Sequence, residues 1–121
     1  MYCIAKSVLE EVRRALTVPE TGGILGIDNT GAVVKFHHDK TGRTIAHRYI
    51  PDVETLNRII AQWHWEGIKF VGFVHSHRAG LTELSACDIR YAEKIKRHCD
   101  MSEVLMLLYI PDGEDFYQFT V

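Results

Sequence analysis

Apolar residues near the N-terminus recur at intervals of three and four positions. They are Ile4, Val8, Val12, Ala15 and Leu16. This spacing puts them on one face of a helix, so the pattern predicts an amphipathic helix from about Ala5 to Leu16. The Val18-Pro19 step ends it, because proline cannot continue a helix.

The pattern then changes to short apolar runs separated by turn residues. A strand with two glycines, Gly22 to Ile27, is followed by the turn residues Asp28 to Gly31 and a second strand, Ala32 to His37. A further turn at Lys40 to Gly42 leads into a third strand, Thr44 to Ile50. These segments predict a three-strand antiparallel meander.

Helical spacing returns after the meander, at Val53, Leu56, Ile60 and Trp63. Asp52 is a good N-cap, so we expect a helix from Asp52 to Trp65 that ends at Gly67. The run Ile68 to Val74 is apolar except for one lysine and predicts a strand buried on both faces.

Ser85 is the expected N-cap of a third helix. The apolar face of that helix is Ile89, Ala92, Ile95 and Cys99. Two strands, Val104 to Ile110 and Phe116 to Val121, complete the chain. The predicted order αβββαβαββ describes one α/β domain over residues 1–121, a mixed sheet with helices on its faces.

Composition narrows the possible functions. Apolar residues make up 46% and charged residues 25% of the 121 residues, and the formal net charge is -2. These values are ordinary for a globular domain, and the scattered lysines and arginines do not form the basic surface of a nucleic-acid binder. No apolar run approaches the roughly 18 residues that a membrane span needs. The three cysteines form no CxxC pair, so we expect reduced thiols and a cytoplasmic protein.

Two of the seven histidines stand out from the rest. We expect the other five to be surface or loop residues, namely His37, His38, His47, His64 and His98. His75 and His77 follow the buried strand, and residues two apart in an extended chain point to the same side. Both imidazoles can therefore reach one metal ion.

A carboxylate completes the predicted metal site. Asp88 lies three residues after Ser85, in the first turn of the predicted helix, and should face the strand end that carries His75 and His77. Two imidazoles and one carboxylate suit zinc and leave a fourth position open, as in catalytic zinc sites. Glu20, followed by Gly22 and Gly23, is the candidate general base, because the glycines let backbone approach closely.

The residues His75-Ser76-His77, Ser85 and Asp88, with Glu20 in Glu-Thr-Gly-Gly-Ile-Leu-Gly upstream, resemble the JAMM (MPN-plus) metalloprotease motif, Glu-x(n)-His-Ser/Thr-His-x7-Ser-x-x-Asp. The resemblance, to the compact prokaryotic type, covers essentially the whole chain. It implies a cytidine-deaminase-like fold and hydrolysis of a peptide or isopeptide bond, often at the C-terminus of a ubiquitin-like or sulfur-carrier protein.

The resemblance also implies a role for each motif residue. His75, His77 and Asp88 would bind one Zn²⁺ per chain, Glu20 would activate water, and Ser85 would stabilise the tetrahedral intermediate. Arg78 stands where the family usually has proline, so the loop from Arg78 to Leu84 is less constrained than in most members.

Other interpretations are weaker but distinct. A zinc deaminase needs His-x-Glu followed by Pro-Cys-x-x-Cys, and this chain has His77 in the glutamate position and no CxxC. A non-catalytic scaffold that keeps a metal for stability is the alternative, although it would not need Glu20. We expect Cys87 to point away from Asp88 into the core, and Trp63 and Trp65 to pack against the sheet rather than form a partner-binding surface.

Overall fold

The computed structural model describes residues 1–46 and 48–121. His47, which falls in the predicted strand Thr44 to Ile50, lies outside the described residues. The helices are α1 (Lys6–Ala15), α2 (Val53–Trp65) and α3 (Ala86–His98). The strands are β1 (Cys3–Ile4), β2 (Gly22–Ile27), β3 (Ala32–His38), β4 (Arg43–Ile45), β5 (Arg48–Ile50), β6 (Lys69–Ser76), β7 (Leu105–Ile110) and β8 (Asp115–Thr120).

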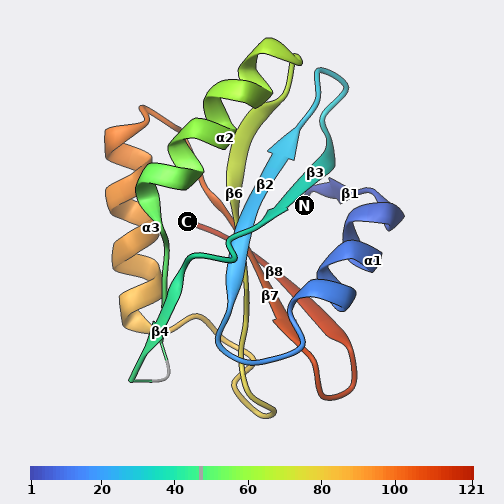
Figure 1. Ribbon diagram of the computed structural model, residues 1–121, viewed down its shortest axis with the longest axis vertical. Helices are drawn as coiled ribbons and strands as arrows, with labels where there is room; N and C mark the ends of the chain where they lie inside the picture. The colour runs from blue at the N-terminus through green and yellow to red at the C-terminus, as the bar shows by residue number, and fades with distance from the viewer. Residues whose placement is uncertain (47) are drawn as a thin grey trace.

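A mixed six-stranded sheet in the order β1-β3-β2-β6-β7-β8 forms the centre of the protein (Figure 1). The β1–β3 and β6–β7 pairs are parallel, and the other neighbours are antiparallel. Strand β6 therefore lies in the middle of the sheet, as its largely apolar sequence predicts. Gly72 lets β7 approach closely, because a Cβ atom at this position would lie 1.8 Å from the carbonyl oxygen of Leu105.

Helices cover both faces of this sheet (Figure 1). One core cluster joins α1 to the sheet and includes Val8, Val12, Leu25, Val74 and Leu107. The opposite cluster joins α2 and α3 to the sheet and includes Ile24, Leu56, Phe73, Ala92 and Met106. Neighbours such as Val74 and Phe73 belong to opposite clusters because side chains alternate along a strand. The predicted α/β class, with helices on a mixed sheet, is confirmed.

The predicted three-strand meander is wrong in its third strand. Strands β2 and β3 do pair antiparallel, but β4 and β5 pair with each other in a separate two-stranded sheet. The two edges of β3 are occupied by β2 and by β1, a two-residue strand that the sequence pattern did not predict. Ala46, at φ 51°, bends the chain between β4 and β5.

The helix predictions hold in extent but not in every buried position. Asp52 caps α2 by accepting a hydrogen bond from the amide of Thr55. Trp63 is buried as expected, whereas Trp65 is 87% exposed and does not pack against the sheet. On α3, Ala92 is buried, but Ile89 and the C-cap residue Cys99 are exposed. The buried face of this helix therefore contains fewer residues than the apolar pattern predicts.

The remaining histidines outside the motif that the structure describes, His37, His38, His64 and His98, are exposed or half-buried, as expected. No helix within residues 1–46 and 48–121 has both the length and the apolar composition to cross a membrane.

Candidate metal centre

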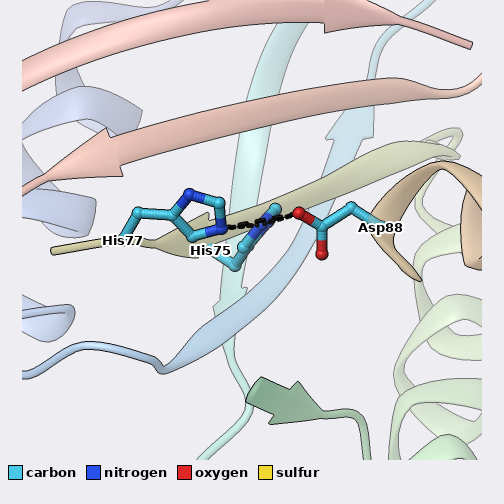
Figure 2. A group of neighbouring side chains, drawn as sticks. All are labelled: His75, His77 and Asp88. Atoms are coloured by element: carbon cyan, nitrogen blue, oxygen red, sulfur yellow. Dashed lines mark hydrogen bonds and ion pairs between the residues drawn. The ribbon is translucent and has the colours of Figure 1, made fainter. Parts of the chain in front are cut away.

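His75 lies near the end of β6 and His77 directly follows that strand, with both rings on the same side (Figure 2). Their Nε2 atoms are 3.0 Å apart, and both residues are buried. The prediction that an extended backbone brings the two imidazoles together is therefore confirmed. Gly22 of β2 pairs with His75 on one side, and Leu108 of β7 pairs with it on the other.

Asp88 reaches the same point from the first turn of α3 (Figure 2). Its Oδ2 atom lies 3.3 Å from Nε2 of His75 and 3.5 Å from Nε2 of His77. These three side chains could hold a metal ion between them. The structure thus brings together the three residues that the sequence predicts as ligands.

The start of α3 fixes the position of this carboxylate. The hydroxyl of Ser85 accepts a hydrogen bond from the amide of Asp88 at 3.0 Å, and Oδ2 of Asp88 accepts one from the amide of Ser85 at 2.8 Å. This reciprocal arrangement is a capping box, which ties both residues to the helix N-terminus. The same Oδ2 atom therefore closes the cap and faces the histidines.

The ring orientation of His77 is set by the loop that follows it. Its Nδ1 atom lies 3.0 Å from the carbonyl oxygen of Leu81. Since a carbonyl can only accept, Nδ1 carries a proton, so in the neutral ring Nε2, which faces His75 and Asp88, is the nitrogen free to bind a metal. In the protonated ring Nε2 instead donates to Asp88. Metal-binding histidines are commonly oriented by this kind of hydrogen bond on the second ring nitrogen.

The ionisation of the cluster follows from its charges. Burial opposes the charged form of Asp88, but hydrogen bonds from His75 and His77 hold the pKa of Asp88 well below its usual range. Burial also lowers the pKa of His77, yet its hydrogen bonds to Asp88 and to Leu81 outweigh that effect. The negative charge of Glu20 adds to the increase, so the pKa of His77 is raised above 6.5.

The segment that carries Glu20 runs along the end of β6, near His77, because β2 pairs with β6. The amide of Ser76 donates to the carbonyl of Thr21 at 2.8 Å, which brings Glu20 alongside the end of β6. Glu20 is buried, and its charge acts on His77. The hydroxyl of Thr44 donates to the Glu20 carbonyl at 2.5 Å, so β4 also holds this segment.

Ser76 has a role that the sequence did not predict. It is fully buried, and its side chain points to the opposite face from the two histidines. Its hydroxyl accepts from the amide of Thr21 at 3.0 Å and lies 3.3 Å from the carbonyl of Val18. Ser76 thereby anchors the segment that carries Glu20. The only signal in the sequence is a small polar residue at a position that should be buried.

Cys87 does not lie in the core, so that prediction is wrong. It is half-buried, and Arg48 and Arg90 both donate hydrogen bonds to its sulfur. Cys87 instead lines a cavity that His75 and Asp88 also line. Arg78 is exposed, and its carbonyl accepts from the amide of Leu81, which closes a turn after His77.

One solved structure shares the fold of the whole chain, whereas a curated relative matches only part of its sequence. No family model matches the chain. A UPF0758 protein of Streptococcus equi subsp. equi (strain 4047) is 45% identical over 47 residues, which are 38% of this chain. The match spans only 21% of that relative's length.

The solution structure of protein DSY2949 from Desulfitobacterium hafniense is similar along 99% of this chain and 82% of its own. The TM-score is 0.65 and the sequence identity 19%. At this identity the likeness concerns the fold alone.

Proposed function

We propose that this chain is a zinc-dependent peptidase or isopeptidase of the JAMM type, with a cytidine-deaminase-like form of the α/β fold. The observation that carries the proposal is the convergence of His75, His77 and Asp88 on one point beside Glu20. We also propose a cytoplasmic location, because the three cysteines of the chain are free thiols, as in reducing compartments.

The spacing of the donor atoms fits zinc. Ligands at about 2.0–2.1 Å in a tetrahedron are separated by about 3.3 Å. The three donor pairs here are 3.0, 3.3 and 3.5 Å apart. Two imidazole nitrogens and one carboxylate oxygen are a typical set for catalytic zinc, with the fourth position left for water or substrate. His75, His77 and Asp88 would hold the ion.

Zinc in such a site lowers the pKa of water toward about 7 and polarises a carbonyl group. The carboxylate of Glu20 would accept a proton from the attacking water and then donate it to the leaving amine nitrogen. The hydroxyl of Ser85 accepts from the amide of Asp88, so its own proton can be donated to the oxyanion that forms on the scissile carbonyl. The expected substrate is a peptide or protein tail, including that of a ubiquitin-like or sulfur-carrier protein.

The test combines metal analysis with a cleavage screen. We expect about one zinc per chain in the wild type and in Glu20→Gln, and loss of zinc in His77→Ala and Asp88→Ala. His98→Ala, which removes an exposed imidazole, is the matched control and should keep its zinc. Cleavage of fusions that end in Gly-Gly, and of short peptides, should stop on addition of a chelator.

Glu20→Gln should lower turnover by about 100-fold or more, since proton transfer by a positioned side chain contributes at least that much. Glu10→Gln, on α1 away from the site, is its control. Wild-type activity in Glu20→Gln would remove Glu20 as the base. Bound zinc with no cleavage of any substrate would favour the scaffold alternative.

A further inference from the structure

A cavity of about 320 Å³ opens beside the candidate metal centre. His75 and Asp88 form part of its wall, and the remainder comes from β5, from the first turns of α3 and from the strands beneath. The volume is close to the lower end of the range for small-ligand sites, about 300–1,000 Å³. It therefore suits a single large side chain more than an extended tail.

The inner wall of this cavity is aromatic and apolar. Phe73, Tyr91, Tyr49 and Met106 line it, and the rings of Phe73 and Tyr91 meet edge to face with centroids 5.4 Å apart. Hydrogen bonding by Tyr49 to the buried carboxylate of Asp39, at 2.7 Å, fixes the Tyr49 ring in the wall. Burial raises the pKa of Tyr91 to about 12, so its phenol stays uncharged.

Cations surround the opening. Arg48, Arg90 and Lys94 line the cavity, and among the lining residues that the structure describes, Asp88 has the only carboxylate. This excess of positive charge contrasts with the net charge of -2 for the whole chain. An occupant with a negative charge would therefore be favoured.

Two of these cations are held close together. Nη1 of Arg48 lies 3.4 Å and Nη2 of Arg90 lies 3.2 Å from the sulfur of Cys87. The two guanidinium groups thus converge on one atom from β5 and from α3, and like charges so placed repel each other. A carboxylate between them would offset that repulsion and could accept bidentate hydrogen bonds.

We propose that this cavity is the specificity pocket of the hydrolase proposed above, and that it takes an aromatic or large aliphatic substrate residue bearing a carboxylate. The apolar wall holds the side chain, and Arg48 and Arg90 hold the carboxylate. That carboxylate belongs either to the residue itself, at a chain end, or to an adjacent acidic residue. The link to hydrolysis rests on the proposed function, but binding of a ligand in the cavity can be measured separately.

The experiment is direct calorimetric binding of N-acetyl-phenylalanine and of N-acetyl-phenylalaninamide, which has the same ring and no charge. Both zinc-loaded and metal-free protein are used, so that a carboxylate held only by the metal can be recognised. We expect the acid to bind about tenfold more tightly than the amide in both forms, since hydrogen bonds to charged groups are worth that much or more. Added salt should weaken the acid more than the amide.

Arg90→Gln and Arg48→Gln should each lower the affinity for the acid toward that of the amide, while Arg90→Lys should retain part of the preference. Arg97→Gln, exposed near the end of the same helix and outside the cavity, is the matched control and should bind like wild type. Thermal unfolding of each variant checks that the fold is intact. N-acetyl-Phe-Glu-amide separates the two sources of carboxylate, because it has an acidic side chain but no terminal carboxylate. It should bind more tightly than N-acetyl-phenylalaninamide only if the adjacent acidic residue supplies the charge.

Equal affinity for acid and amide, or binding unaffected by both arginine variants, would overturn the pocket proposal even if the protein cleaves peptides. Preference for the acid that depends on zinc but not on the arginines would also overturn it. If the protein fails to bind added zinc but still binds the acid through the arginines, the pocket proposal stands and the hydrolase proposal fails. The two proposals can therefore fail independently.

Discussion

Replacing Ser85 by alanine separates the structural role of this residue from its proposed chemical role. The change removes the hydroxyl that accepts from the amide of Asp88. It keeps the backbone amide of residue 85, which donates to Oδ2 of Asp88 at 2.8 Å. Half of the capping box therefore survives, and that half holds the oxygen that faces the histidines.

The cost of the lost cap can be estimated. Replacing serine at an N-cap by alanine typically costs about 1 kcal/mol, within about 0.5–2 kcal/mol. In a domain of 121 residues this corresponds to a decrease in Tm of about 3–5 °C. Urea unfolding of metal-free protein measures it without a contribution from bound zinc. Asp52→Ala, which removes the cap of α2, is the control and should lose at least as much, because Asp52 also accepts from the hydroxyls of Thr41 and Thr55.

The chemical role should appear in turnover. We expect Ser85→Ala to keep its zinc but to lose about 100-fold to 1,000-fold in kcat, the usual effect of removing one donor to an oxyanion. Asp52→Ala should lose stability alone. Unchanged stability of metal-free Ser85→Ala would refute the capping argument, and loss of zinc would refute the claim that the remaining amide is enough to orient Asp88. Normal kcat at full zinc content would limit Ser85 to a capping role.

Three further predictions concern the fold and the charge of the site. Trp63→Ala, at a buried position, should lower the free energy of unfolding by about 3–5 kcal/mol. Trp65→Ala, at an exposed position, should change it by less than about 0.5 kcal/mol, and urea unfolding measures both. Gly72→Ala should cost about 3 kcal/mol or more, because the new methyl group meets a backbone carbonyl 1.8 Å away; soluble expression and Tm test it, and a mild effect would contradict the close approach of β7. In metal-free protein the pKa of His77 is raised above 6.5 and that of Asp88 is lowered below 3.8, so the stability that this pair contributes should be complete between about pH 4 and pH 6.5. This stability should be lost as the pH rises through the pKa of His77 in the folded protein, and also as the pH drops through the pKa of Asp88 in the folded protein. Urea unfolding at a series of pH values measures it, and a free energy of unfolding that does not change with pH would contradict the coupling.

Local sequence patterns predicted the elements around the site well, because each one depends on neighbouring residues. The cap at Ser85, the buried strand before His75 and the turn after β2 are all set within a few positions. The site follows from them, since strand alternation aligns the histidines and the capping box directs Asp88. The convergence of three ligands is therefore readable from spacing.

Longer-range arrangements were not readable in this way. Strand β1 is only two residues long and is defined by its parallel pairing with β3, so it has no periodicity of its own. That pairing leaves no edge of β3 for β4. The position of Cys87 likewise depends on Arg48, which is distant in sequence, and a helical wheel contains no information about it.

Helix α3 buries few of its side chains against the sheet. Ala92 is its one fully buried residue, yet its first turn supplies Asp88. An ion held jointly by β6 and this turn would act as a clamp between two segments separated by a loop. Amide hydrogens of α3 should exchange with solvent more readily than those of β6 in metal-free protein, and loading with zinc should narrow that gap, because a ligand that binds only the closed form suppresses local opening.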